Sequence, residues 1–192
     1  MKPKLASHNS LTYLPPKKWY LYPLRFIARC QSKSLEEQYK LGIRFFDFRI
    51  SFDRNFNVEI RHGLMAYKGN VETFLDFLNK KRNCYVRLIL ERKLDEEDIQ
   101  LFQHYCDTLI KKYPRVKFCG GIDKEYWKVI YEFKYNPTYE DKYSSNNTLG
   151  TPCTGTYLDD WWPWIYAKCN NKRNIKEGTD KEFLMIDFVN IQ

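Results

Sequence analysis

Apolar and polar positions along the chain repeat with two periods, one typical of β-strands and one typical of α-helices. A period of two, or a short buried apolar run, predicts six or seven strands. These strands are expected at 4–7, 44–51, 58–62, 85–91, 116–119, 127–133 and 183–189. Apolar positions three or four residues apart predict helices that begin near residues 34, 70, 95 and 164.

Capping residues support the first two helices, and an amphipathic pattern supports the third. Ser34 and Glu37 have the spacing of a capping box, and Gly42 follows as a residue suited to end the helix. Asn70 is a favourable N-cap for the second helix. The longest helix is expected from 95 to about 112, with one apolar face toward the core.

The alternation of strands and helices predicts an α/β fold with a largely parallel sheet. Six or seven strands in 192 residues favour a compact or incomplete TIM-type (β/α) barrel. A complete eightfold barrel typically needs roughly 250 residues. We interpret 1–192 as a single domain. The segment at about 135–156 is dense in Asn, Ser, Thr, Pro and Gly, and is predicted to be an irregular loop.

The composition is that of a folded protein rather than a disordered one. Hydrophobic residues make up 43% of the chain and aromatic residues 17%, which is ample material for a core. No apolar run approaches the roughly 20 residues of a membrane span, and residues 1–10 lack the apolar stretch of a signal peptide. We therefore expect a protein that is cytoplasmic or peripheral to a membrane.

The charge and the cysteines narrow the choice of partner and compartment. The formal net charge of +8 suits a partner that carries phosphate, such as an anionic membrane surface or a nucleic acid. The six cysteines lie far apart and have no metal-binding spacing. Reduced thiols are therefore expected rather than a disulfide framework.

Polar side chains interrupt the apolar faces near the ends of several predicted strands. Asp47 and Arg49 share one face of their strand, because side chains two residues apart point the same way. Glu91 is in phase with Arg87, and Asp187 is in phase with apolar residues of the last strand. The carboxyl ends of parallel strands form the mouth where ligands bind. We therefore expect one site made of His8, Asp47, Arg49, His62, Glu91 and Asp187.

Two histidines beside a guanidinium are suited to cleave a phosphodiester without a metal. One imidazole takes a proton from a hydroxyl and the other gives a proton to the leaving oxygen. Arg49 offers a rigid fork for two phosphate oxygens, and a carboxylate such as Asp187 can hold the base in its useful tautomer. Two structural interpretations stay open: Asp47 with Arg49 as a structural ion pair, and Glu91 as the partner of Arg92.

Three segments resemble the X-domain signature of the phosphatidylinositol-specific phospholipase C superfamily. Residues 7–10 (SHNS) resemble the first catalytic segment, and 38–50 (QYKLGIRFFDFRI) the strand with its Asp and Arg. Residues 61–63 (RHG) resemble the second histidine motif, and 86–91 and 186–189 are similar to later barrel strands. The first 92 residues match well and the remainder matches in fragments. Three motifs in the right order are specific, whereas one alone would be weak.

The resemblance implies a role for each principal group. His8 would be the general base on the inositol 2-hydroxyl, and His62 the general acid toward the glycerol oxygen. Arg49 and Asp47 would lie around the phosphate. The reaction would release diacylglycerol and leave a cyclic inositol phosphate. Substrate binding is assigned to Asn9, Glu91, Arg92 and Trp19.

The resemblance also bears on metals. Calcium-dependent members of the superfamily have an acidic ligand where this chain has Arg49, so we expect no metal and no other cofactor. Asn9 and Glu91, however, match positions of the calcium-dependent enzymes. Calcium bound by Asn9, Asp47 and Glu91 therefore stays an alternative, which the positive charge of Arg49 disfavours.

Tryptophan residues point to a membrane surface as a partner. Amphipathic aromatic rings favour the interface between lipid and water, and Lys17 and Lys18 adjoin Trp19. Trp19 is expected on a rim loop and is the better candidate for lipid docking. For the Trp-rich segment 161–164, core packing is the favoured interpretation.

Two other functions fit part of the pattern. The same histidines could act on RNA, where a 2′-hydroxyl also yields a cyclic phosphate. The chain has no RNA-binding motif, so no nucleic-acid partner is expected. The other alternative is a catalytically weak module that binds lipid or a protein partner. We favour catalysis because all the principal groups are present.

Overall fold

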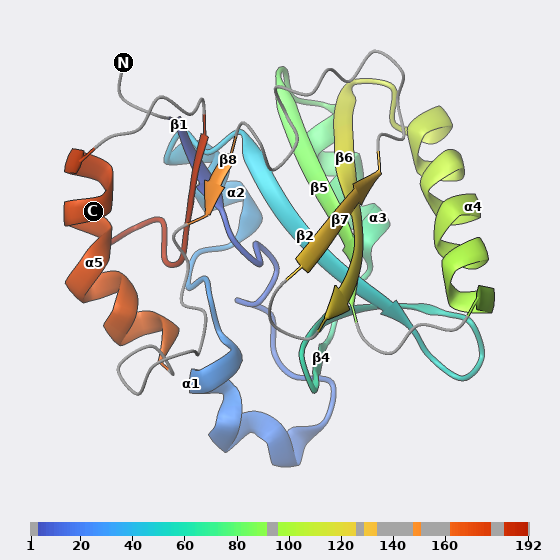
Figure 1. Cartoon of the computed structure of the whole chain (residues 1–192), viewed down its shortest axis with the longest axis horizontal. Helices are drawn as coiled ribbons and strands as arrows, with labels where there is room; N and C mark the ends of the chain where they lie inside the picture. Colours follow the sequence, from blue (N-terminus) through green and yellow to red (C-terminus); the bar gives the residue numbers. More distant parts are fainter. Residues whose placement is uncertain are drawn as a thin grey trace.

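The computed structural model describes residues 4–91, 96–125, 129–133, 148–150, 162–177 and 183–191 (Figure 1). The strands are β1 Lys4–Ser7, β2 Phe45–Phe52, β3 Val58–His62, β4 Met65–Tyr67, β5 Cys84–Leu90, β6 Val116–Glu125, β7 Val129–Phe133, β8 Thr148–Gly150 and β9 Phe183–Ile186. The helices are the 3-10 helix η1 Trp19–Leu24 and the α-helices α1 Arg25–Ala28, α2 Leu35–Lys40, α3 Val71–Asn79, α4 Glu96–Lys112 and α5 Pro163–Glu177.

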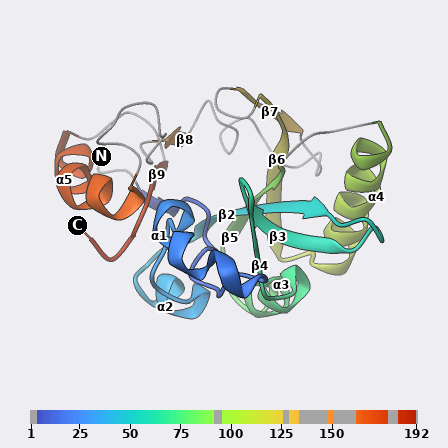
Figure 2. The same cartoon turned by 90° about the horizontal axis from the view of Figure 1, so that it is seen from below.

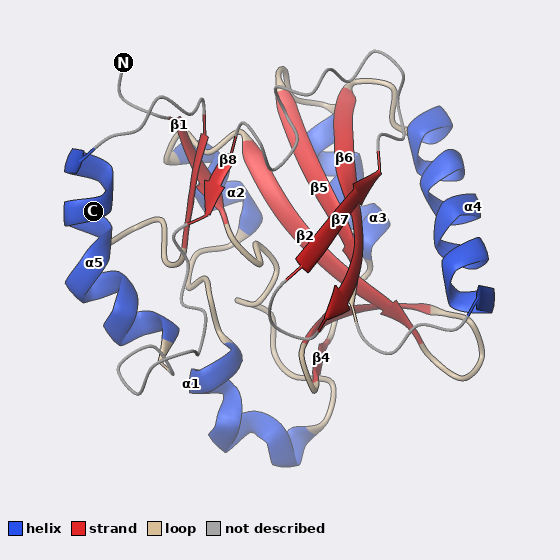
Figure 3. Ribbon diagram, in the orientation of Figure 1, coloured by secondary structure: helices blue, strands red, loops and turns tan. Residues whose placement is uncertain are grey.

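These strands form one mixed sheet, drawn in red in Figure 3. Its hydrogen-bonded order is β7-β6-β5-β2-β1-β9-β8. The strands from β6 to β8 in this order pair in parallel, whereas β7, β3 and β4 join by antiparallel pairing. Within the described residues, the edge strands β7 and β8 do not pair with each other. The prediction of an α/β fold with an incomplete barrel is therefore confirmed.

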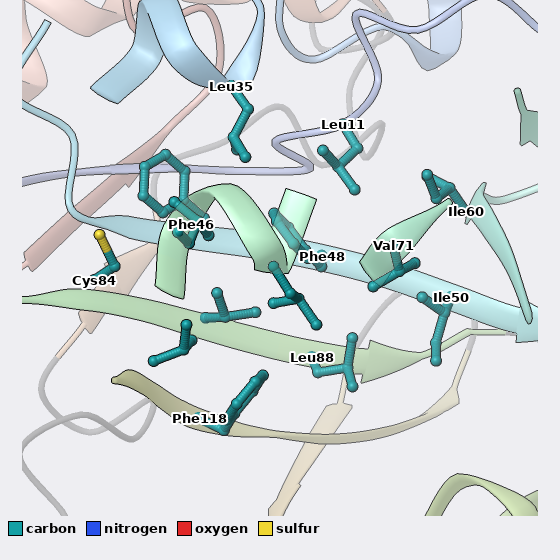
Figure 4. Close-up of a cluster of buried hydrophobic side chains, with 14 of the residues drawn as sticks. Leu11, Leu35, Phe46, Phe48, Ile50, Ile60, Val71, Cys84, Leu88 and Phe118 are labelled. Atoms are coloured by element: carbon teal, nitrogen blue, oxygen red, sulfur yellow. The ribbon is translucent and has the colours of Figure 1, made fainter. Parts of the chain in front are cut away.

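Apolar side chains cover the outer face of the sheet and one end of its inner face. On the outer face, alternate residues of β2, β5 and β6 pack against α3 and α4. Figure 4 shows Phe46, Phe48 and Ile50 in this layer with Leu88 and Phe118, and Figure 2 shows α2 and α3 along this side. A smaller inner cluster consists of Ala6, Phe45, Tyr85, Cys119, Phe183 and Met185. The inner face is thus apolar at one end and polar at the other.

The predicted helix boundaries agree with local hydrogen bonding. The Ser34 side chain accepts from the backbone N–H of Glu37, and the Glu37 carboxylate accepts from the backbone N–H of Ser34, which completes a capping box. Gly42, with φ +93°, follows the end of α2. The Asn70 side chain accepts from the N–H of Glu72 at 2.8 Å. The first residues of the predicted strand 127–133 and helix 95–112 lie outside the described residues.

Several details of the predicted fold are wrong. The described residues contain nine strands rather than six or seven, because β4 and β8 are too short for a period of two to be recognised. β8 lies within the predicted irregular loop 135–156, and the rest of that segment lies outside the described residues. The last strand ends at Ile186 rather than 189, since the chain turns at Phe188 with φ +46°. Trp19 lies on a 3-10 helix rather than a loop.

Candidate active site

A polar cluster lies at the carboxyl ends of the central parallel strands. The strand pairing sets these ends level, because Ser7 of β1 is in register with Ile186 of β9. His8 and Asp187 each follow these residues directly, so their side chains leave the sheet at the same level. Both residues are buried, among polar groups rather than hydrocarbon.

The contacts of His8 define its tautomer. Its Nε2 lies 2.9 Å from Nη2 of Arg49 and 3.1 Å from Nδ2 of Asn9. A guanidinium nitrogen only donates hydrogen bonds, so Nε2 accepts and the proton of the neutral ring is on Nδ1. Nδ1 donates to Oδ1 of Asp187 at 2.8 Å. His8 therefore presents an unprotonated Nε2 to the centre of the cluster.

Arg49 joins the carboxylates of two neighbouring strands. Its Nε donates to Oδ2 of Asp47 at 3.2 Å, and its Nη1 donates to Oε1 of Glu91 at 3.1 Å. Because Nη2 contacts His8, all three nitrogens of the guanidinium have partners in the cluster. The ion pair of Asp47 and Arg49 is thus part of the site. The partner of Glu91 is Arg49, and Arg92 lies outside the described residues.

Backbone N–H groups of two turns also donate hydrogen bonds to these carboxylates. The N–H of Asn9 donates to Oδ2 of Asp47 at 3.1 Å. The N–H of Gly63, where φ is +55°, donates to Oε2 of Glu91 at 2.9 Å. These contacts tie the segments that follow β1 and β3 to the carboxyl ends of β2 and β5.

His62 reaches the site through an antiparallel hairpin. β3 pairs with β2 so that Ile60 lies opposite Ile50. His62 comes two residues later at the end of β3, and the antiparallel direction of β3 carries the chain back from the carboxyl end of β2. His62 therefore does not lie at the carboxyl end of a parallel strand, as the sequence led us to expect, because β3 runs antiparallel to β2.

The two histidine rings lie close enough to serve one phosphate. Their centroids are 6.2 Å apart and their planes meet at 81°. Nδ1 of His62 donates to the carbonyl oxygen of Ala28 at 2.8 Å. This contact leaves Nε2 of His62 as the atom for proton transfer. The Nε2 atoms of His8 and His62 are therefore the two candidates for proton transfer.

Burial and charge set the protonation of the cluster. Burial alone would raise the pKa of Asp47, but the guanidinium groups of Arg49 and Arg87 hold that pKa below its usual range. Burial would lower the pKa of Arg49, but Asp47 and Glu91 raise it instead. Burial lowers the pKa of His62 below its ordinary value of 6.5, and the charge of Arg49 adds to this effect. An anion bound beside His62 would raise that pKa again.

Two turns in the left-handed region support the site. Asn9 has φ +44° and Phe188 has φ +46°, and each directly follows a residue of the cluster. Asn tolerates this conformation well, whereas a bulky aromatic residue adopts it rarely. The N–H of Phe188 donates to the carbonyl of Cys30 at 2.7 Å. Gln31 donates to backbone carbonyls at the ends of β1 and β9. The segment that contains Cys30 and Gln31 therefore holds both turns in place.

Cys30 lies inside the site, although no sequence signal singled it out. Its Sγ lies 3.8 Å from Nδ1 of His62 and 3.7 Å from Nδ2 of Asn9. Burial raises the pKa of this thiol well above its ordinary value. The cysteines of the described residues are free thiols, in agreement with the sequence. A group of metal-binding side chains also occurs here, formed by His8, Cys30 and Asp187.

Exposed apolar residues form an aromatic surface beside the site. Trp19 is 84% exposed, and Trp162 and Trp164 are each 49% exposed. The rings of Phe26 and Trp162 are 6.0 Å apart, so α1 adjoins the start of α5. Core packing is therefore the wrong interpretation for Trp162 and Trp164, and Trp161 lies outside the described residues. We define the aromatic surface as Trp19, Tyr20, Tyr22, Leu24, Phe26, Ile27, Trp162 and Trp164.

The aromatic surface lies at the same end of the molecule as the polar cluster. Figure 1 shows α1 below the carboxyl end of β1. Exposed apolar patches of this kind mark sites that bind proteins, lipids or ligands.

Among the described helices, none has both the length and the apolar character needed to span a bilayer.

Comparisons with known proteins place this architecture among bacterial phospholipases. No protein-family model and no curated protein sequence matches the chain. The phosphatidylinositol-specific phospholipase C from Listeria monocytogenes has a similar structure, with a TM-score of 0.60 and 17% identity, over 97% of this chain and 88% of that one. A variant of the phosphatidylinositol-specific phospholipase C from Staphylococcus aureus gives a TM-score of 0.62 and 14% identity, over 97% and 85% of the two chains. The present chain therefore has the fold of bacterial phosphatidylinositol-specific phospholipases C.

Proposed function

We propose that residues 1–192 act as a single catalytic domain that cleaves inositol phospholipids or glycosylinositol anchors, as a phosphoric diester hydrolase or lyase, through a cyclic inositol phosphate. The observation that carries this proposal is the unprotonated Nε2 of His8, which lies 2.9 Å from a guanidinium nitrogen of Arg49. The other ring nitrogen of His8 donates a hydrogen bond to Asp187. Intramolecular attack of a substrate hydroxyl on phosphorus needs a general base close to the group that binds the phosphate. The names of the structural neighbours supply the substrate class.

In the proposed first half of the reaction, Nε2 of His8 takes the proton of the inositol 2-hydroxyl. The hydroxyl oxygen attacks phosphorus and closes the cyclic phosphodiester. Asp187 accepts the Nδ1–H bond throughout, which stabilises the imidazolium that forms. The phosphate oxygens bind Arg49, whose guanidinium counters the negative charge that develops on them.

In the other half of the reaction, the glycerol oxygen leaves phosphorus and takes a proton from Nε2 of His62. His62 has to enter this step protonated. Its pKa is lowered in the ligand-free site, but the charge of a bound phosphodiester acts in the opposite direction. The products are diacylglycerol and the cyclic inositol phosphate, with one proton taken up by His8 and one released by His62.

Two buried acceptors support binding of a polyhydroxylated headgroup. Oδ1 of Asp47 and Oδ1 of Asn9 have no hydrogen-bond partner among the described residues. A buried acceptor without a partner is costly, and hydroxyl groups of the inositol ring would satisfy both atoms. Glu91 would act on the substrate indirectly, by orienting Arg49.

We propose that the reaction needs no metal or other cofactor. The guanidinium of Arg49 lies between the carboxylates of Asp47 and Glu91, with contacts of 3.2 Å and 3.1 Å. A calcium ion held by these carboxylates would have to displace that cation. Arg49 therefore supplies the positive charge that calcium would otherwise provide.

The proposed function is tested with phosphatidylinositol vesicles, with and without a chelator, by phosphorus NMR. We expect a cyclic inositol phosphate at a rate that the chelator does not lower. Turnover that the chelator abolishes would overturn the role of Arg49. Failure to form the cyclic product from vesicles would overturn the proposed substrate, and a cyclic nucleotide product from RNA would favour the alternative enzyme.

We propose that the aromatic surface docks on lipid, as one of the neighbouring structures concerns membrane binding by the Staphylococcus aureus enzyme. Trp19→Ala should lower kcat/KM on vesicles about tenfold or more, because insertion of an indole ring is worth more than about 1.4 kcal/mol. Turnover of a soluble short-chain substrate should stay the same, because Trp19 lies outside the polar cluster. The measurement is the ratio of the two rates.

Leu41→Ala is the matched control for Trp19→Ala. Leu41 is an exposed apolar residue just before β2, at the opposite end of that strand from the polar cluster. Its loss should change neither rate. Equal losses with vesicles and soluble substrate in Trp19→Ala would count against a docking role.

A further inference from the structure

Three metal-binding side chains from separate segments meet beside the His8 ring. His8 follows β1, Cys30 follows α1 and Asp187 follows β9. One ligand atom of each residue lies within 4.8 Å of the other two, and all three residues are buried. Nδ1 of His8 contacts Asp187, whereas Nε2 contacts Arg49. A metal bound through Nδ1 would use the ring nitrogen that the proposed proton transfer does not use.

The ligand types and spacings suit zinc. Zn²⁺ binds thiolate sulfur, imidazole nitrogen and carboxylate oxygen, in tetrahedral geometry. Bond lengths of about 2.0 to 2.3 Å imply spacings of roughly 3.3 to 3.6 Å between two ligand atoms on one ion. Nδ1 of His8 and Oδ1 of Asp187 are 2.8 Å apart, so this pair needs to open by only about half an ångström. A thiolate ligand disfavours calcium and magnesium, which prefer oxygen.

We propose that His8, Cys30 and Asp187 form a binding site for Zn²⁺ that inhibits the enzyme. The fourth position on the metal is open to water or to another side chain. Inhibition rests on the proposed function of the site. Metal binding does not, since it follows from the three ligands alone.

His62 is the nearest candidate for the fourth ligand. Its Nδ1 lies 3.8 Å from Sγ of Cys30, close to the roughly 3.6 Å expected between sulfur and nitrogen on one zinc ion. Binding through this atom would give up its hydrogen bond to the carbonyl of Ala28. A metal bound here would then involve both histidines of the proposed reaction.

Zinc on Nδ1 would disable His8 as a base. The metal replaces the proton on Nδ1, and the neutral ring then carries its proton on Nε2, so Nη2 of Arg49 and Nδ2 of Asn9, which donate to Nε2 in the metal-free site, would have to move away. An imidazole with a metal on one nitrogen and a proton on the other has no lone pair to accept another proton. Asp187 would bind the metal instead of orienting the ring. Occupation of the site therefore predicts loss of turnover rather than weaker substrate binding alone.

Cobalt provides a measurement that does not depend on turnover. Titration of the full chain with Co²⁺ should give a thiolate-to-metal charge-transfer band that saturates at one ion per chain, and Zn²⁺ should displace it. Cys30→Ser should abolish the band and weaken zinc binding at least about tenfold by calorimetry. Cys169→Ser is the matched control, because this thiol is exposed on α5, and it should change neither result. Circular dichroism checks the fold of each variant.

Inhibition is measured with a soluble inositol phosphodiester, and each variant is compared with its own zinc-free rate. We expect reversible inhibition of the unsubstituted chain, and a half-inhibitory zinc concentration at least about tenfold higher in Cys30→Ser. A missing band in the unsubstituted chain, or a band that persists in Cys30→Ser, would overturn the metal site. A band that depends on Cys30 without any phosphodiester turnover would uphold the metal site and overturn the proposed function. Turnover that zinc does not slow would overturn the inhibitory role.

Discussion

Replacement of His8 by Asn should lower kcat/KM on phosphatidylinositol by about 10²- to 10⁴-fold, the usual contribution of a general base. The Asn amide nitrogen falls where Nδ1 of the ring lies, so the hydrogen bond to Asp187 at 2.8 Å can be retained. The acceptor that lies 2.9 Å from Arg49 is lost. The rate of cyclic product formation measures the effect.

His104→Asn is the matched control for this prediction. His104 is an exposed histidine on α4 and lies outside the polar cluster. It should leave kcat/KM unchanged, and both variants should retain the melting temperature to within a few degrees, as expected for a small change in stability. Substantial activity in a folded His8→Asn variant would refute its role as the base.

Replacement of Arg49 by Lys should lower kcat/KM by about 10²- to 10³-fold, the cost of losing a preorganised donor to the transition state. A lysine keeps the charge between Asp47 and Glu91, but a single ammonium cannot reproduce three directed contacts at 2.9 to 3.2 Å. The expected loss is in kcat more than in KM, because the guanidinium acts on charge that develops during the reaction. Steady-state kinetics separate the two parameters.

Two further arginine variants separate catalysis from stability. Arg44→Lys lies at the opposite end of the same strand, where the side chain donates to backbone carbonyls, and it should leave the rate unchanged. Arg49→Met should lower the free energy of unfolding by about 3–5 kcal/mol, because it leaves the buried Asp47 carboxylate without its partner. An Arg49→Lys variant as active as Arg44→Lys would contradict the assignment.

The pH dependence of stability has a sign that follows from Asp47. The pKa of this carboxyl in the folded chain lies below its ordinary value of 3.8. Its contribution to stability is therefore complete above about pH 3.8 and is lost as the pH falls through the lower folded pKa. Arg49→Met removes the main cause of the shift, so its stability should depend less steeply on pH in this acid range.

Much of the central sheet could be predicted from local patterns. The period of two in β2 separates Phe46 and Phe48 from Asp47 and Arg49, and the structure has the first pair in the outer apolar layer and the second in the polar cluster. The capping box at Ser34 predicted the start of α2, because its hydrogen bonds join residues only three positions apart in the sequence. Both features depend on residues that are close together in the sequence, so the local pattern is enough to predict them.

The features that the sequence did not predict depend on contacts between segments that are distant in the chain. The three-residue strands β4 and β8 exist only through their pairing with longer strands. Cys30 enters the site because its N–H donates to Thr12 and its carbonyl accepts from Phe188, which are remote in the chain. The exposure of Trp162 and Trp164 likewise depends on which surface covers the start of α5. Residue types and spacing carry no signal for such pairings.

Local patterns in the sequence were enough to predict the α/β class, the phase of each long strand and the groups available for proton transfer and phosphate binding. These follow from backbone geometry, which sends alternate side chains to opposite faces wherever a strand forms. How these groups meet depends on contacts between distant segments. The strand register sets His8 level with Asp187, the antiparallel hairpin brings the ring centroid of His62 to 6.2 Å from that of His8, and Cys30 lies beside them. Such distances arise from strand pairing and turn geometry over the whole chain, where many weak contacts act together and no local pattern encodes the result.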